Sequence, residues 1–155
     1  MTNNTVLRRL RYLLALNEQK MQAIFEHTAC PADTIQLANW LCKEGAKEEK
    51  PCPDQQLAYF LNGLIIERRG RQTDKPEPIA ETKLTNNLIL KKLKIAFDLQ
   101  AEDILTLLST SDFILSRHEL SAFFRRPDHK HYRLCQDQVL RHFLTGLQHQ
   151  HRPSY

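Results

Sequence analysis

The sequence contains little glycine, and this scarcity argues against one large class of folds. Only 4 of the 155 residues are glycine, whereas β-rich folds depend on many tight turns in which glycine supplies the positive φ angles. Apolar and polar residues do not alternate over a strand's length, apart from short ambiguous pieces such as "LIIE". We therefore expect a helical protein.

Long apolar runs and paired cysteine motifs are also missing. No run approaches the roughly 20 apolar residues that cross a bilayer, and Met1 is followed by polar residues instead of an apolar signal region. The four cysteines form no C-x-x-C motif, so neither a zinc ribbon nor a small disulfide scaffold is indicated. We expect a soluble, cytoplasmic protein with reduced thiols.

The composition that remains is that of a globular protein with a mildly basic charge. Hydrophobic residues make up 41% of the chain and charged residues 26%, with a formal net charge of +4. This balance supplies enough apolar side chains for a core. It permits binding to nucleic acid or to an acidic partner without requiring either.

One ten-residue segment occurs twice in the chain. "TNNTVLRRLR" begins at residue 2 and "TNNLILKKLK" begins at residue 85, and the same offset of 83 pairs Trp40 with Phe123 without a gap. This is an internal duplication. We predict a first helical repeat over residues 1–69, a proline-containing linker over 70–83, a second repeat over 84–148 and a polar tail over 149–155.

Each repeat is predicted to contain four helices. In the first repeat, apolar side chains recur at helical spacing over about residues 3–16, 18–28, 33–43 and 53–68, and the second repeat follows the same pattern. Asp33 and Ser116 are the predicted N-caps of the third helices. Because each repeat is small for independent stability, we expect an all-α fold in which two tandem four-helix units pack together with pseudo-twofold symmetry.

Several motifs together resemble the YehS-like family of bacterial proteins, a duplicated domain of unknown function. They are the two "TNN" openings, the two "C-x-D-Q-x-L…F-L-x-G-L" closings and the segment "FFRRPDHKHYRLC". The resemblance implies a bacterial cytosolic protein with two copies of an all-helical domain, and it implies no reaction, ligand or functional residue. The first repeat has "LCKEGAKEEKPC" where the second has "FRRPDHKHYRLC", so any site on this basic loop would belong to the second repeat alone.

Two basic triplets on the repeated first helix are the main binding candidates. On a helical wheel, the cations of the first triplet spread over the whole solvent face. They are either a solvated surface with ordinary ion pairs or a surface that contacts nucleic-acid phosphates without reading the sequence. The triplets are Arg8, Arg9 and Arg11 in the first repeat and Lys91, Lys92 and Lys94 in the second.

Paired asparagines open the same two helices, as Asn3 and Asn4 and as Asn86 and Asn87. One asparagine of each pair is expected to cap the helix. The other is not needed for capping. It is predicted either to bond to the other repeat or to help hold an anion at the positive end of the helix.

Cys52 and Cys135 precede the fourth helix of their repeats at the same spacing. A thiol at the N-cap, with Gln55 or Gln138 at the third helical position, would form an arrangement like a capping box. A thiol at a helix N-terminus can have a lowered pKa and raised reactivity. The two cysteines are therefore either structural or a reactive, redox-sensing pair.

Gly63 and Gly146 lie inside otherwise apolar helices, where glycine is about 1 kcal/mol less favourable than alanine. Each lies at the edge of the apolar face, beside Phe60 or Phe143. We predict that another backbone passes close to each glycine, with a helix of the other repeat as the expected partner. A bound ligand at this position is the weaker alternative.

The remaining patterns support no metal, cofactor or catalytic site. His129, His131 and Cys135 contain metal-ligating groups, but their spacing matches no established ligand pattern. No motif singles out a nucleophile or a general acid. The second and third helices have the outline of a helix-turn-helix, yet the third helix offers few side chains for base contacts.

The leading prediction is a non-enzymatic binding or regulatory module. It would engage nucleic acid or an acidic protein through the basic faces of its duplicated first helices. The alternative is a protein-protein interaction scaffold, or an oligomer, that uses an apolar helical groove.

Overall fold

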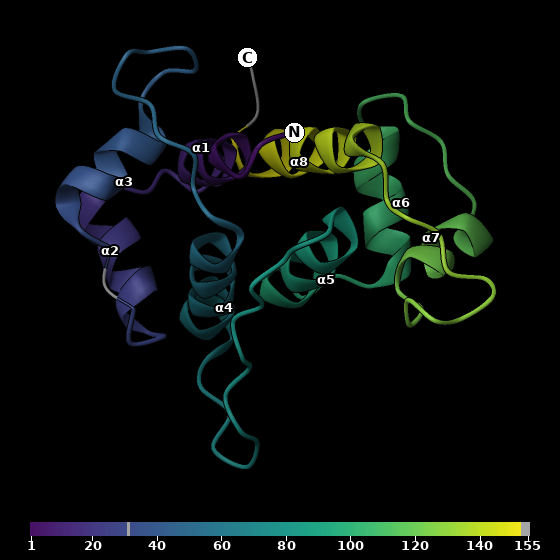
Figure 1. Ribbon diagram of the computed structural model, residues 1–155. Coiled ribbons are helices and arrows are strands. Elements are labelled where there is room, and N and C mark those ends of the chain that lie inside the picture. The colour runs from purple at the N-terminus through teal and green to yellow at the C-terminus, as the bar shows by residue number, and fades with distance from the viewer. Residues whose placement is uncertain (31, 153–155) are drawn as a thin grey trace. The chain divides into compact units, whose positions relative to one another are not determined.

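The computed structural model describes residues 1–30 and 32–152, and within them it contains eight α-helices and no strand (Figure 1). The chain divides into two compact units, the first from Met1 to Lys83 and the second beginning at Leu84. Each unit holds four helices. The predicted all-α fold with two tandem four-helix repeats is confirmed.

The helices of the two repeats begin at equivalent positions. In the first repeat they are α1 (Asn3–Leu13), α2 (Glu18–Glu26), α3 (Thr34–Leu41) and α4 (Asp54–Arg69). In the second they are α5 (Asn86–Ala96), α6 (Ala101–Ser109), α7 (Arg117–Phe123) and α8 (Asp137–His151). Each helix of the second repeat starts 83 residues after its counterpart, so the sequence duplication is also a structural one. None of the described helices has the length and apolar character that a membrane span requires.

Capping side chains define several of these starts. Thr2 and Thr85 cap α1 and α5, because their side chains accept hydrogen bonds from the backbone N–H groups of the first turn. Asp33 and Ser116 cap α3 and α7, as predicted.

The first two helices end earlier than their apolar periodicity indicates. Ala15 and Ala29 follow α1 and α2 with φ angles of 53° and 54°. This left-handed conformation breaks the helical hydrogen-bond pattern. In the second repeat, Asp98 and Asp112 take the same conformation at the equivalent positions, with φ of 53° and 61°.

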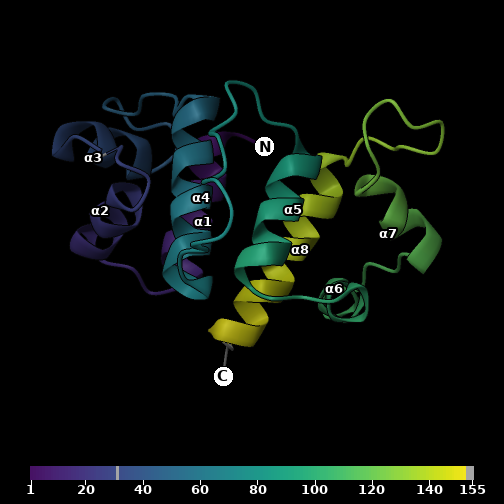
Figure 2. The same cartoon turned by 90° about the horizontal axis from the view of Figure 1, so that it is seen from below.

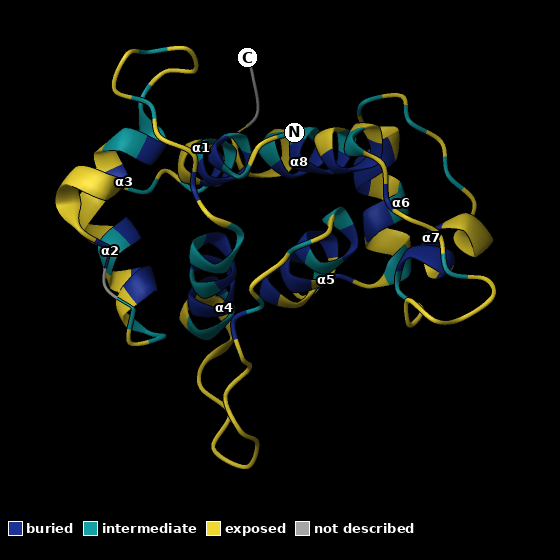
Figure 3. Ribbon diagram, in the orientation of Figure 1, coloured by how far each residue is buried: buried dark blue, intermediate teal, exposed yellow. Residues whose placement is uncertain are grey.

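The core of the first repeat forms around α4. The Phe25 ring of α2 lies 5.2 Å from the Phe60 ring of α4 and 6.2 Å from the Trp40 ring, and all three side chains are buried. α2 packs chiefly on α4, and α3 packs on α1. Figure 3 shows the buried residues of α2 on the side that faces α4.

The second repeat uses the same core positions with a different arrangement of its third helix. α6 packs closely on α8, where Phe143, Leu144 and Leu147 are completely buried. α7 packs chiefly on α6, which Figure 2 shows nearly end-on beside it. The third helix therefore leans on the first helix in one repeat and on the second helix in the other.

Gly63 and Gly146 lie where two helix backbones approach most closely. A Cβ atom added at Gly63 would collide with the carbonyl oxygen of Ile24 in α2, and one at Gly146 would collide with that of Leu107 in α6. The expected partner in the other repeat is thus wrong, because the passing backbone belongs to the same repeat. The second and fourth helices of each repeat pack backbone against backbone.

The linker and the tail differ in how far they follow the prediction. Residues 70–79 are exposed (Figure 3), and Arg71 in this stretch pairs with Glu77 and donates a hydrogen bond to the carbonyl of His27. The predicted polar tail is not a separate segment at its start, because α8 continues through His151. Residues 153–155 of that tail lie outside the described residues.

Candidate functional site

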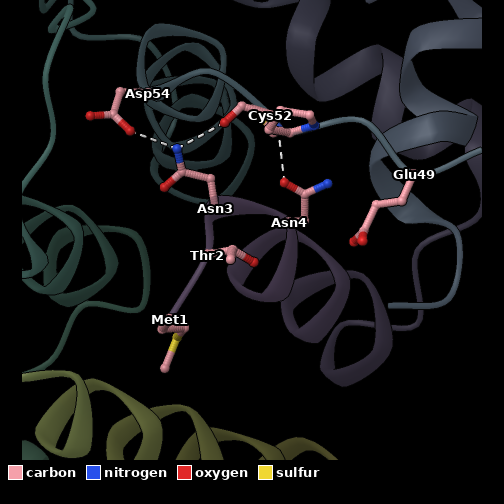
Figure 4. A pocket seen from close by; sticks show the side chains of 8 residues that line it. Met1, Thr2, Asn3, Asn4, Glu49, Cys52 and Asp54 are labelled. Carbon is pink, nitrogen blue, oxygen red and sulfur yellow. Dashed lines mark hydrogen bonds between the residues drawn. The ribbon is translucent and has the colours of Figure 1, made fainter. Parts of the chain in front are cut away.

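Asn4 is buried and joins three segments of the first repeat. Its Nδ2 donates hydrogen bonds to the carbonyls of Trp40 (3.2 Å) and Lys50 (2.7 Å), and its Oδ1 accepts one from the Cys52 amide (2.8 Å; Figure 4). Asn87 makes the same bonds with Phe123 (3.0 Å), Arg133 (2.8 Å) and Cys135 (2.9 Å). Because the amide groups are buried and engaged within the protein, Asn4 and Asn87 are not available to bind an anion.

Asn3 and Asn86 tie the first helix of each repeat to the start of the fourth. The Asn3 amide donates to the Cys52 carbonyl (2.9 Å) and to the Asp54 carboxylate (2.6 Å), as Figure 4 shows. The equivalent Asn86 bonds join Cys135 (3.0 Å) and Asp137 (2.7 Å).

The predicted roles of the paired asparagines are therefore wrong. Threonines cap the helices, and both asparagines of each pair bind the backbone or carboxylate groups of their own repeat. We call each pair the asparagine clasp: Asn3 with Asn4, and Asn86 with Asn87. The sequence could not reveal this role, since the partners lie 36 to 51 residues away along the chain.

A shallow pocket lies beside each clasp. The first has a volume of about 410 Å³ and the second about 400 Å³. No lysine or arginine side chain lines either pocket, and the Asn3 and Asn86 amides within them already donate to Asp54 and Asp137. The clasp pockets therefore offer no basic side chain to an anionic ligand.

The two clasp cysteines are unreactive by their surroundings. Cys52 and Cys135 are only 4% and 1% exposed. Burial, together with the nearby Asp54 or Asp137 carboxylate, raises the pKa of each thiol to about 12. The N-cap of the helix is the residue after each cysteine. The hypothesis of reactive thiols is thus wrong, because both groups stay protonated.

Arg8 is part of the fold instead of a free binding group. Its guanidinium donates to the Glu49 carboxylate (3.0 Å) and to the Cys42 carbonyl (3.2 Å), and its side chain is 17% exposed. The helical wheel places Arg8 on the solvent face of α1. In the structure its guanidinium is engaged by the protein instead. It bridges α1 to the loop that follows α3.

The other cations of the triplets also differ in exposure. Arg9 is half-buried, and burial lowers its pKa; Lys92 at the equivalent position is buried, with 7% exposure. The prediction that the first triplet spreads over the whole solvent face is wrong for Arg9, and the equivalent Lys92 is also away from the surface. Arg11 and Lys91 are exposed, and Lys94 is partly exposed.

Two of these cations lie in a groove between α5 and α7, which we call the basic groove. Its volume is about 590 Å³. Basic side chains and an apolar floor line it, and its lining includes no carboxylate. The lining residues are Lys91, Lys94, Ile95, Ala101, Arg117, Leu120, Ser121, Phe124 and Arg125.

The first repeat has an equivalent groove that is smaller and electrically balanced. Its volume is about 250 Å³, and its only charged lining residues are Arg11 and Glu18. Each of its lining positions recurs in the basic groove 83 residues later. The lining residues are Arg11, Glu18, Leu37, Ala38, Leu41 and Cys42.

The four cations of the basic groove have different partners. The Lys94 ammonium lies over the Phe124 ring, 5.8 Å from its centroid, and Arg117 pairs with Glu102. Lys91 and Arg125 make no hydrogen bond or ion pair with any described residue. At least these two cations are available to an anionic ligand.

The loop after α7 extends the basic surface beyond the groove. Residues 125–133, "RRPDHKHYR", contain four Lys and Arg and a single carboxylate, which pairs with Arg126 (3.6 Å). The equivalent residues 42–50, "CKEGAKEEK", contain three lysines and three glutamates. Arg117 is the groove cation that the sequence reasoning does not mention. Phe124 and Arg125 begin the segment "FRRPDHKHYRLC", whose contrast with the first repeat points toward them.

The late histidines do not form a ligand set in the described part of the chain. No group of three His, Cys, Asp or Glu side chains is placed there to share a metal ion. The rings of His129 and His131 lie 5.5 Å apart on the exposed loop, whereas Cys135 is buried beneath the clasp.

Comparison with known proteins relates both repeats to one family. Residues 3–70 and 86–152 each match the family described as protein of unknown function (DUF1456). The chain is 44% identical over 147 residues to the Escherichia coli (strain K12) protein named uncharacterized protein YehS, covering 95% of this chain and 94% of that protein. No solved structure shows a significant match. The resemblance seen in the sequence motifs is confirmed.

Proposed function

The chain belongs to the DUF1456 family, whose description states no activity, and we propose that it is a non-enzymatic binding module for nucleic acid. The proposed binding surface is the basic groove together with the loop of residues 125–133. The first repeat is proposed to serve as a structural copy. The groove of the first repeat contains one arginine and one glutamate, so this repeat has no comparable basic surface.

The observation that carries this proposal is the change of charge between two equivalent grooves. The first-repeat groove has one arginine and one glutamate, whereas the basic groove has four cations and no acid. Residues 1–83 contain 12 Lys and Arg against 11 Asp and Glu, and residues 84–155 contain 10 against 7. A local excess of positive charge attracts the phosphates of a nucleic acid and increases its rate of association.

The extent of the basic surface favours nucleic acid over a short acidic peptide. Arg125 belongs both to the groove and to the loop, so the cations continue from one into the other. A nucleic-acid strand carries one phosphate per nucleotide and would engage both parts. A peptide seated in the groove would leave the loop cations unused.

A cytoplasmic location is part of the proposal. All four cysteines are free, and reduced thiols are the usual state in the cytosol. Nucleic acids are present in the same compartment.

Fluorescence anisotropy tests this function directly. Fluorescein-labelled RNA and DNA oligonucleotides would be titrated with the full chain at several salt concentrations, and affinity should fall steeply as salt rises. Lys94→Glu should weaken binding to every sequence and reduce the salt slope by about 1 or more.

Arg11→Glu provides a matched control, because Arg11 is the equivalent residue in the first-repeat groove. This variant should bind as tightly as the unaltered chain. Absence of binding at low salt would overturn the proposal, and so would equal losses for the Arg11 and Lys94 variants.

A protein-binding scaffold is the second candidate, and one observation favours it. Ile95 on the floor of the basic groove is 41% exposed, which is high for a large apolar side chain next to buried Leu120. A partner that binds chiefly through this apolar floor would bind with little dependence on salt. The same salt series therefore separates the two candidates.

A further inference from the structure

The first repeat carries an internal anion beside its first helix. The Glu49 carboxylate accepts one hydrogen bond from Arg8 (3.0 Å) and another from the Gly45 amide (3.2 Å). Glu49 therefore neutralises the cation that α1 presents toward the loop after α3. The fold can hold an anionic oxygen at this point.

The second repeat keeps the cation and lacks the anion. Lys91 is equivalent to Arg8, but Tyr132 stands where the first repeat has Glu49. Lys91 is exposed, lines the basic groove and makes no ion pair with a described residue. The position of the Glu49 carboxylate in the first repeat is held by Tyr132 in the second, so no described carboxylate of the fold neutralises Lys91.

We infer that the ligand of the basic groove is a single-stranded nucleic acid, with a backbone phosphate beside Lys91 and an adjacent base against Phe124. This inference rests on the proposed function and names the kind of nucleic acid. The Glu49 carboxylate of the first repeat stands in for the phosphate that the second repeat takes from its ligand.

The floor of the groove explains the preference for a single strand. Ile95 and Phe124 form the accessible apolar part of a groove of about 590 Å³, with the buried Leu120 beneath them. Unstacked bases bind to such surfaces because every base has an apolar face that stacks on an aromatic ring. A duplex keeps its bases paired inside and presents a convex, charged backbone, so it would leave this floor uncovered.

The distribution of cations fits the same ligand. Lys94 lies over the Phe124 ring, and Arg125 begins the basic loop. A base on Phe124 would place its flanking phosphates near the rim, where these cations and Lys91 lie. The loop then offers further cations to the following nucleotides, with the partly exposed Tyr132 among them.

The test restores the first-repeat carboxylate in the second repeat. Tyr132→Glu would place an anion beside Lys91, and Tyr132→Gln is the matched control of equal size without the charge. The probes are a fluorescein-labelled thymidine strand and the duplex that it forms with an adenosine strand. Anisotropy gives the affinity, and circular dichroism melting checks that each variant is folded.

We expect the single strand to bind the unaltered chain more tightly than the duplex. Tyr132→Glu should weaken single-strand binding about tenfold or more, whereas Tyr132→Gln should remain within about threefold. Phe124→Ala should weaken single-strand binding about tenfold and leave weak duplex binding unchanged. If Tyr132→Glu fails to fold, Lys91→Glu at an exposed position removes the same phosphate contact.

The possible outcomes separate this inference from the proposed function. Duplex binding equal to or tighter than single-strand binding, with a steep salt dependence, would overturn the inference and leave nucleic-acid binding in place. Equal losses for Tyr132→Glu and Tyr132→Gln would overturn the phosphate position. Binding of neither probe at low salt, or binding of polyglutamate alone, would overturn both proposals.

Discussion

The two repeats agree in their internal bonds and differ in one groove and the loop beside it. Their helices begin at equivalent positions, their asparagine clasps make the same hydrogen bonds, and their second and fourth helices cross at a glycine. The grooves that contain Arg11 and Lys94 differ in volume and in charge. The asparagines of the clasps and the glycines of the crossings are the same in both repeats, whereas the groove and the loop beside it carry different residues.

This comparison teaches where a duplicated protein can diverge. Asn4 and Asn87 each bond to three backbone groups, so replacing either would leave buried donors and acceptors without partners. A groove residue such as Arg125, in place of Cys42, alters charge and leaves the bonds of the asparagine clasp unchanged. The first repeat has the balanced surface, and the second has the basic one.

The helix crossing is the shared feature whose loss should have the largest effect. Gly63→Ala and Gly146→Ala should each lower the free energy of unfolding by about 3 kcal/mol or more, because the added Cβ collides with a carbonyl oxygen and forces two helices apart. Urea unfolding followed by circular dichroism would measure the change.

The comparison predicts similar losses at the two glycines. Gly45→Ala is less informative about packing, because nothing lies near that position but its φ of 84° brings its own strain. Wild-type stability in either crossing variant would show that the two crossings are not equivalent.

Substitution of a clasp asparagine should cause the second-largest loss of stability. Asn4→Ala and Asn87→Ala each leave one amide N–H and two carbonyls without a side-chain partner, which should lower the free energy of unfolding by about 3 kcal/mol. Thermal and urea melts of the two variants would test the equivalence of the clasps. A loss confined to one variant would mean that only that repeat depends on its clasp.

Replacing the left-handed residue after the first helix by glycine should increase stability, by less than the losses expected above. Ala15 has φ of 53° in the first repeat, while the second repeat has Asp98 there with the same angle. Ala15→Gly should raise the free energy of unfolding by about 0.5 to 1 kcal/mol, because glycine removes the Cβ strain of this conformation. Asp98→Gly is the control and should gain less, since aspartate tolerates the conformation better than alanine.

The smallest expected effect is on the pH dependence of stability, to which Glu49 contributes in the first repeat alone. A hydrogen bond from the Gly45 amide, followed by one from Arg8, holds the pKa of Glu49 below its ordinary value of 4.5. Its contribution to stability is therefore present above that pH and is lost as pH falls through the lower, folded-state pKa.

Urea midpoints measured between about pH 6 and pH 3 would detect this contribution. Glu49→Gln should make the decline with falling pH shallower, whereas Tyr132→Gln at the equivalent position should not change it. Identical pH profiles for Glu49→Gln and the unaltered chain would mean that the Arg8 pair adds no stability.

The helices and the duplication could be predicted because their signals are local or strictly periodic. The spacing of Leu57, Phe60, Leu61 and Leu64 along α4 indicates an apolar helix face directly, and these residues are buried. Asp33 could be recognised as a cap for the same reason, since its partners lie two and three residues away.

The candidate site could be predicted only in part, because its geometry depends on contacts between distant segments. The basic loop after α7 was visible in the sequence, but the groove is built from α5, α7 and the start of α6, which are distant along the chain. A helical wheel treats Arg8, Arg9 and Arg11 alike, yet Glu49 engages the first and burial encloses the second. Long-range pairing of this kind leaves no periodic trace.

The asparagine clasp also fixes both ends of the loop that follows α3, while the middle of the loop lies at the surface. Asn4 binds the carbonyl of Trp40 on one side of the loop that follows α3, and the carbonyl of Lys50 and the amide of Cys52 on the other. The ends of the loop are thus anchored to α1, and the eight or so residues between them are exposed or partly exposed. Loops held in this way tolerate changes of sequence with little effect on the fold. The tethered loop of each repeat can therefore vary in sequence above a constant scaffold, and it is the natural position at which to engineer a new surface.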